Sequence, residues 1–179
     1  MKLFDFNKNR QQIAQLRPRL LRLALSWCGQ MELAEDLVQE TVARALKSHV
    51  AIKDHSKINS WVFTILSNCY RDCLRKKISQ ESYEESIDEH ALTPEEHFQQ
   101  NQTSNKVRIA ISQLPDNQRI VITLVDLEEF SYTEVAQILD IPVGTVMSRL
   151  NRARNLLKPK LLHQDSAGTV FKPHLERVK

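Results

Sequence analysis

The sequence predicts an all-α protein of two small helical domains that a flexible acidic linker joins, the C-terminal domain being a helix-turn-helix. Three observations lead to this fold class. Apolar residues recur at helical spacing, charge is divided into blocks, and only 3 of 179 residues are glycine, where average usage gives about a dozen. So few glycines disfavour a turn-rich β fold and exclude the glycine-rich loops that hold phosphates in many enzymes.

The charge blocks set the domain boundaries. Residues 1–78 hold 14 Lys and Arg against 7 Asp and Glu, whereas residues 79–105 hold 7 acids and no Lys or Arg. Residues 106–179 hold 11 bases and 8 acids, so the net charge of +3 hides the division. Two basic bodies with a negative connector are expected. The predicted domains are 1–78 and 106–162, with residues 79–105 as the linker and the start of the next helix, and 163–179 as a tail.

The N-terminal block is expected to form three helices. Apolar residues between 13 and 27 recur at spacings of three and four, which is the period of a helix buried on one face. Pro18 should kink this helix or start it, and Gly29 is a plausible helix stop. The second helix is expected over about 32–47 and the third over about 60–77.

Polar faces on these two helices are candidate binding surfaces. The second helix exposes an acidic face in an otherwise basic body, which favours a basic protein partner over DNA, although simple solvation explains it too. Its residues are Glu35, Asp36, Gln39 and Glu40. The third helix places an Asn among cations, so the amide could bond a base while the cations hold the backbone. Its polar side holds Thr64, Asn68, Arg71 and Arg75, and Lys76 and Lys77 extend the charge. An ordinary charged surface is an equal alternative there.

The second basic block begins with helices that precede the most specific motif. Thr93 and Pro94 predict a helix start, with Val107, Ile111 and Leu114 on its apolar side. Another helix is expected from Pro115. Its apolar residues are Ile120, Val121, Leu124 and Leu127.

A helix-turn-helix is predicted after these segments. Ser131 and Glu134 form the pattern of a capping box before a short helix. Residues 140–144 break that helix, and a further helix then carries an apolar stripe at spacings of four, three and four. The stripe is Val146, Leu150, Ala153 and Leu157. Two short helices joined by a tight turn are typical of a DNA-reading unit.

The opposite side of the last helix is the predicted DNA-reading face. Its hydrogen-bonding side chains suit the base edges of a major groove. They are Ser148, Asn151, Arg152 and Asn155. Arg149 and Arg154 flank them and suit phosphates. Gly144 and Thr145 stand at the helix start, where backbone N–H groups also favour a phosphate.

The cysteines and histidines suggest no further chemistry. Cys69 and Cys73 lie in the apolar stripe of the third helix, where small thiols commonly fill space. We expect no metal, no cofactor and no catalytic residue. No membrane span or signal peptide is expected, so the predicted location is cytoplasmic. A thiol or metal sensor that uses Cys28, Cys69 and Cys73 is an alternative from another class.

Taken in order, these segments resemble extracytoplasmic-function sigma factors of bacterial RNA polymerase. The matching segments are 34–41 (AEDLVQET), 61–77, 114–115 and 131–146. The resemblance extends over about residues 10–162. It implies a non-enzymatic factor that binds core RNA polymerase, directs it to promoter DNA and is held inactive by an anti-sigma factor.

The resemblance also implies roles for the candidate residues. The face with Glu35, Asp36, Gln39 and Glu40 would dock on the polymerase. The helix with Asn68 would read the −10 element near a flipped base, with Trp61, Arg71, Arg75 and Lys76 beside it. The −35 element would be read by Gly144, Thr145, Ser148, Arg149, Asn151, Arg152 and Arg154. The acidic linker would thread the polymerase channel that later holds RNA.

The sequence departs from the family at two reading positions. The family usually has Lys or Arg where this chain has Met147, so a contact is missing or an apolar contact to a thymine methyl replaces it. Asn151 stands where some members have an aromatic residue. The promoter sequence therefore does not carry over. A stand-alone helix-turn-helix repressor or activator is the main alternative, and it would bind DNA tightly without polymerase.

Overall fold

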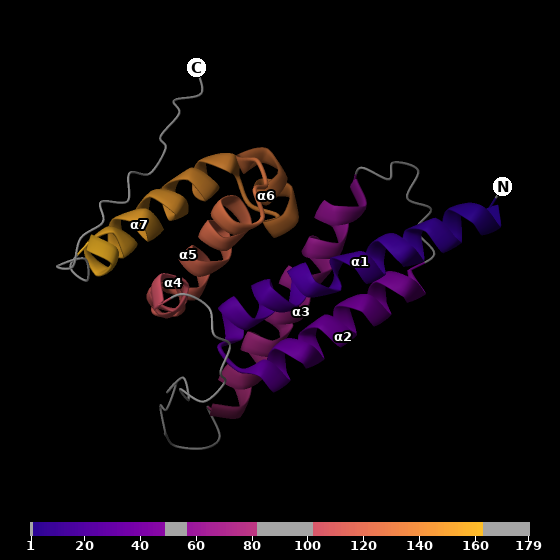
Figure 1. The fold of residues 1–179 in the computed structure, drawn as a ribbon, viewed down its shortest axis with the longest axis horizontal. Coiled ribbons are helices and arrows are strands. Elements are labelled where there is room, and N and C mark those ends of the chain that lie inside the picture. Colours follow the sequence, from indigo (N-terminus) through magenta and orange to yellow (C-terminus); the bar gives the residue numbers. More distant parts are fainter. Residues whose placement is uncertain (1, 49–56, 82–101, 163–179) are drawn as a thin grey trace.

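The structure, a computed structural model, describes residues 2–48, 57–81 and 102–162, and every regular element in them is a helix. The N-terminal bundle consists of α1 (Lys2–Cys28), α2 (Met31–Lys47) and α3 (Ile58–Glu81). The C-terminal bundle consists of α4 (Gln102–Ser112), α5 (Asp116–Ile122), the π-helical turn η2 (Thr123–Leu127), α6 (Tyr132–Leu139) and α7 (Val143–Leu162). Figure 1 shows the bundles side by side, the first in indigo to magenta and the second in orange to yellow.

The N-terminal bundle follows the predicted apolar stripes. In α1 the stripe is buried from Ile13 to Trp27, whose side chain is 0% exposed. The helix begins at Lys2, well before Pro18, so Pro18 lies inside the helix and does not start it. Gly29 has φ 74°, a left-handed conformation that glycine adopts without strain. The predicted stop at Gly29 is therefore confirmed.

Helix α3 is buried on two sides, whereas the sequence predicted one. The apolar stripe predicted around Cys69 also holds Val62 and Leu66, and these three side chains are buried in a helix that packs against α1 and α2. Phe63 and Tyr70, at 0% and 3% exposure, lie on a second face about 100° around the helix from that stripe. This second face contacts the C-terminal bundle, because the Phe63 ring meets the Phe130 ring at 5.0 Å and the Tyr70 hydroxyl donates to the Asp116 carboxylate at 3.2 Å.

The segment after Pro115 differs from its predicted form. A single helix carrying Leu127 on its apolar side was expected. Instead α5 ends at Ile122 and a π-helical turn follows, closed by a hydrogen bond of 3.1 Å from the Glu128 N–H to the Thr123 carbonyl. The wider turn rotates the chain, so Leu127 is 53% exposed while Leu124 is fully buried. The predicted burial of Leu127 was wrong for this reason.

The helix-turn-helix is confirmed. Ser131 and Glu134 form a complete capping box, with the Ser131 hydroxyl accepting from the Glu134 N–H and the Glu134 carboxylate accepting from the Ser131 N–H. Asp140 ends α6 in a left-handed conformation, φ 53°. The stripe of α7 is buried as predicted, at Val146, Leu150, Ala153 and Leu157.

The two bundles pack against each other most extensively where α3 meets α6 and where α1 meets α4 and α5. The sequence left open whether the domains are splayed or packed, and the structure is the packed form. The helix start predicted at Thr93 and the acidic stretch over 82–101 lie outside the described residues, as does the tail over 163–179.

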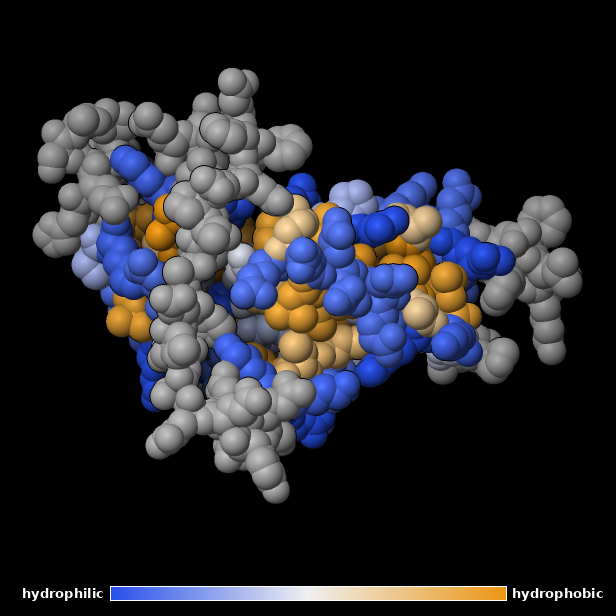
Figure 2. Space-filling model, turned by 90° about the horizontal axis from the view of Figure 1, so that it is seen from below, coloured by the Kyte–Doolittle hydropathy of each residue, from blue (hydrophilic) through white to orange (hydrophobic). Residues whose placement is uncertain are grey.

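Apolar and hydrophilic side chains alternate over the surface seen from below, where orange patches are interrupted by blue side chains (Figure 2). Among the described helices, none is both long enough and apolar enough to cross a membrane.

Replacing Ser131 by Ala should weaken α6. The variant loses the capping hydroxyl, and such a change costs about 1 kcal/mol of folding stability, which urea unfolding measures.

The same cap makes stability depend on pH. In the folded wild type, two hydrogen bonds from Ser131, one from its hydroxyl and one from its backbone N–H, lower the pKa of Glu134. The stabilisation is therefore present above the unfolded pKa of about 4.3 and is lost as the pH falls through the lower folded pKa. Ser131→Ala should show a smaller stability loss than the wild type on acidification through that window. An equal loss in both would contradict this account of the cap.

Candidate nucleic-acid interface

Helix α7 presents the predicted reading face to solvent. Ser148, Asn151 and Arg152 are exposed, and the Ser148 hydroxyl donates to the Thr145 carbonyl at 3.0 Å. Within the described residues Arg152 forms no ion pair, so its planar guanidinium is available for bidentate contact. Its geometry suits the N7 and O6 acceptors of a guanine in a major groove. Gly144, also exposed, has no atom within 4 Å of a Cβ placed on it.

The two flanking arginines differ. Arg149 is half-buried and forms no ion pair among the described residues. Arg154 instead pairs with Asp126 of η2, at 2.7 Å between Nη2 and Oδ1. Hydrogen bonds to that carboxylate raise the pKa of Arg154 further. Arg154 therefore braces α7 against the π-helical turn, and a phosphate would have to compete with Asp126 for it.

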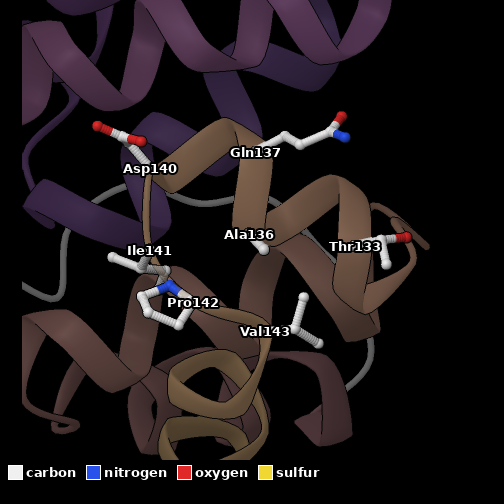
Figure 3. Close-up of a pocket in the computed structure, with 7 residues that line it drawn as sticks. All are labelled: Thr133, Ala136, Gln137, Asp140, Ile141, Pro142 and Val143. Atoms are coloured by element: carbon white, nitrogen blue, oxygen red, sulfur yellow. The ribbon is translucent and has the colours of Figure 1, made fainter.

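The turn between α6 and α7 forms a shallow hollow of about 410 Å³. Figure 3 shows its lining residues, with Thr133 and Val143 on one edge and Gln137 and Asp140 extending toward the helices of the N-terminal bundle. The lining residues are Thr133, Ala136, Gln137, Asp140, Ile141, Pro142 and Val143. Next to it on α7, Met147 is 53% exposed. An apolar side chain thus lies within the predicted reading face, among hydrogen-bonding ones.

On α3 the second candidate face is partly engaged by the other bundle. Asn68 is exposed, but Arg71 is half-buried. The Arg71 guanidinium donates to the Leu139 carbonyl at 2.6 Å and to the Asn68 amide oxygen at 3.2 Å. Leu139 is the last residue of α6. The structure thus brings a predicted −10 side chain to the end of a helix in the helix-turn-helix.

The other predicted −10 residues of α3 are Arg75, Lys76 and Trp61. Arg75 is exposed and pairs with Asp72, which lowers the pKa of that carboxyl. Lys76 is exposed, and Trp61 is half-buried at the start of the same helix. Asn68, Arg71 and Arg75 also line one shallow hollow along α3. The predicted side chains therefore share one surface.

The acidic face of α2 is solvent-exposed as predicted. Glu35, Asp36 and Gln39 are exposed. Glu40 pairs with Arg44 at 2.6 Å, and Arg44 also reaches Asp72 of α3 at 3.4 Å. The carboxylates of Glu35 and Asp36 are thus presented to solvent at one end of this face.

The three cysteines differ in burial. All three are free, with Cys69 buried and Cys28 and Cys73 half-buried. Burial raises the pKa of Cys28 and of Cys69, so both are protonated at neutral pH. No group of three or more metal-ligating side chains occurs in the part of the chain that the structure describes.

Sequence reasoning missed the residues between the bundles. Arg19 of α1 pairs with Glu128 at 2.7 Å, and the Glu128 side chain is only 4% exposed. The Trp27 indole N–H donates to the Thr123 hydroxyl at 2.8 Å in a buried position. Arg119 of α5 donates to the Trp27 carbonyl. These contacts join residues about a hundred positions apart, so no local pattern signals them.

The fold and these surfaces define a two-part transcription factor, and comparisons with known proteins agree. Residues 12–79 match the family "Sigma-70 region 2" and residues 104–157 match "Sigma-70, region 4". The chain is 37% identical over 162 residues to the ECF RNA polymerase sigma factor EcfG of Rhodopseudomonas palustris strain TIE-1, covering 88% of this chain and 87% of the relative. It is 35% identical over 141 residues to the ECF RNA polymerase sigma factor SigM of Bacillus subtilis strain 168, covering 76% and 85%.

A solved structure is also similar. The sigma factor RpoE from Bartonella quintana, in complex with the anti-sigma factor NepR, matches with a TM-score of 0.72 and 30% identity. The match covers 85% of this chain and 95% of RpoE. The chain therefore belongs to the extracytoplasmic-function sigma factors of bacterial RNA polymerase. This membership confirms the resemblance seen in the sequence. The family consists of non-enzymatic transcription initiation factors.

Proposed function

We propose that this chain binds core RNA polymerase, directs it to promoters with defined −35 and −10 elements, and helps to open the duplex. The observation that carries the proposal is that the matches to regions 2 and 4 coincide with two exposed hydrogen-bonding surfaces. One lies on α3 and the other on α7. A stand-alone regulator would need only the second.

The C-terminal bundle supplies the −35 contacts. Helix α7 lies in the major groove, with Ser148, Asn151 and Arg152 toward base edges. Gly144 and Thr145, at the start of the helix, approach a phosphate. Arg149 holds the backbone, and Arg154 joins it where a phosphate displaces Asp126. The predicted domain over 106–162 carries this role.

The N-terminal domain, residues 1–78, supplies the −10 contacts and the polymerase contacts. Asn68 bonds an unstacked base on the surface of α3, while Arg71, Arg75 and Lys76 hold the strand. Trp61 offers an aromatic edge nearby. The acidic face of α2, with Glu35, Asp36, Gln39 and Glu40, meets a basic surface of the polymerase.

We also propose an anti-sigma partner and a cytoplasmic site of action. The similar RpoE structure is a complex with an anti-sigma factor, and it covers both bundles of this chain. A protein that seats on the packed form would keep α3 and α7 from DNA. Core polymerase and promoter DNA, the other two partners, place the activity in the cytoplasm.

Transcription with purified core polymerase tests the function. Adding the chain to core enzyme and a randomised promoter pool should give transcripts from templates that share −35 and −10 sequences. Tight sequence-specific binding by the chain alone, without a stable complex with core, would support the stand-alone regulator instead.

Reversing the charge at Asp36 should weaken core binding. Asp36→Arg places a cation where an acid faces the polymerase, so affinity for core should fall at least tenfold while far-UV circular dichroism stays the same. Gln15→Arg, on an exposed position of α1, adds charge to the same bundle and should have little effect. Binding is measured by fluorescence anisotropy of labelled protein. Equal affinity of Asp36→Arg and wild type would remove α2 from the polymerase interface.

Removing the guanidinium of Arg152 should relax −35 selectivity. Arg152→Ala should cost about 1–3 kcal/mol of discrimination at one base pair if the contact is bidentate. The measurement is competition between −35 variants for the holoenzyme at fixed salt. Lys158→Ala, farther along α7 and exposed, is the matched control and should leave selectivity intact. A uniform loss on all sequences would instead mark Arg152 as a phosphate contact.

Met147 should read a thymine methyl. Its exposed side chain has no hydrogen-bond donor and only a weakly accepting thioether sulfur, so an apolar base atom suits it best. Replacing the contacted thymine by deoxyuracil removes one methyl and should cost about 0.8 kcal/mol. Met147→Ala should bind both templates equally. If deoxyuracil has no effect at any −35 position in the wild type, Met147 makes no such contact.

A further inference from the structure

We propose that the free chain is self-inhibited at its −10 surface, because three arginine contacts between the bundles hold Arg71 away from DNA. The proposal rests on the proposed −10 role of α3 and goes beyond it by assigning a regulatory function to the interface between the bundles. It needs no partner protein.

Arg71 carries the inhibition directly. Its guanidinium donates to the Leu139 carbonyl at 2.6 Å, where α6 ends. The carbonyls at a helix C-terminus carry partial negative charge, which favours a cation there. A DNA phosphate would use the same donors. Arg71 therefore cannot bind the end of α6 and a promoter strand with the same N–H groups.

The C-terminal bundle makes the reciprocal contact. Arg119 of α5 donates to the Trp27 carbonyl in the last turn of α1, and also to the Leu114 carbonyl at 2.8 Å. The Tyr70 hydroxyl donates to the same Trp27 carbonyl at 2.9 Å. Each bundle thus lends an arginine to the C-terminal end of a helix in the other bundle. Both contacts are lost when the bundles separate.

A third arginine, Arg19 of α1, forms an ion pair between the bundles. Arg19 pairs with the buried Glu128 carboxylate and lies 5.6 Å from the centre of the Phe63 ring. Phe63 meets Phe130 of the C-terminal bundle edge-on, at 5.0 Å between ring centres. A buried ion pair is sensitive to the loss of one partner, because the other charge is left without compensation. A substitution at Glu128 that removes its charge should therefore weaken the packing of the two bundles against each other.

Closure and DNA binding are then linked. If only the open form binds, the apparent DNA affinity of the free chain is the intrinsic affinity multiplied by the open fraction. Weakening contacts that lie far from Arg71 should raise DNA affinity. A purely structural interface would not have that effect.

Two variants weaken closure without touching the DNA face. Glu128→Gln removes the charge that holds Arg19, and Thr123→Val removes the acceptor of the Trp27 indole N–H with little change of shape. Gln113→Ala is the matched control, because it removes a hydrogen bond of 2.7 Å to Lys160 within the C-terminal bundle. All variants are checked for wild-type helix content by circular dichroism.

Small-angle scattering measures opening, and anisotropy measures DNA binding. The DNA probe is the single-stranded non-template −10 sequence that the wild-type holoenzyme selects from a randomised pool. Glu128→Gln and Thr123→Val together should raise the radius of gyration of the free chain and tighten probe binding at least fivefold. Gln113→Ala should change neither. Adding Arg71→Ala to the open variant should remove the gain in affinity.

Two results would overturn the proposal. A larger radius of gyration with unchanged probe affinity would show that the Arg71 contact does not limit DNA binding. An unchanged radius in the double variant would show that these contacts do not hold the bundles together. If the holoenzyme selects no −10 sequence, the proposed function fails, and scattering still decides whether the contacts close the chain.

Discussion

The burial of α3 on two sides is the constraint on which the rest of the structure depends. One face completes the N-terminal bundle, and the other, with Phe63 and Tyr70, contacts the C-terminal bundle at Phe130 and Asp116. The polar side of α3 that is left for DNA has Asn68, Arg75 and Lys76 exposed and Arg71 half-buried. A helix with this much apolar surface needs a second partner, since exposing large aromatic side chains to water is unfavourable. Any separation of the bundles must give that face a new environment.

Arginines have two uses in this molecule. A nucleic-acid-binding protein needs cations on its surface, and here three of them lie between the bundles instead. Arg71 and Arg119 bind helix C-termini, while Arg19 neutralises the buried Glu128. Arg154 is likewise paired, with Asp126. The charge that would attract DNA is therefore partly neutralised within the chain, so the free chain should bind promoter DNA weakly without polymerase.

The sequence predicts what depends on neighbours along the chain. The stripes of α1 and α7, the capping box at Ser131 and the glycine stop at Gly29 follow from spacing and turn chemistry, and the structure confirms them. The reading face of α7 follows from the same helical period. Exposure of the candidate residues there agrees with that pattern, while their contacts with DNA stay a prediction.

The remaining features depend on residues distant in the sequence. The π-helical turn rotates Leu127 outward, and no local signal in the segment indicates the extra residue per turn. The sequence does not distinguish Arg19, Glu128 and Arg119 from ordinary surface charges, because their partners lie in the other bundle. One signal was present: Phe63, Tyr70 and Leu74 fall on one side of α3 at helical spacing, apart from the stripe with Leu66. A helix with two apolar sides indicates a second packing partner.

The distance between the bundles tests this account most directly. With the native cysteines replaced, spin labels at Glu32 of α2 and Lys158 of α7, both exposed, report that distance by pulsed electron resonance. The free chain should give one narrow distribution that matches the packed structure, and adding core polymerase should shift it to a longer distance. A broad, long distribution in the free chain would contradict the account, because the contacts of α3 would then not hold the two bundles together.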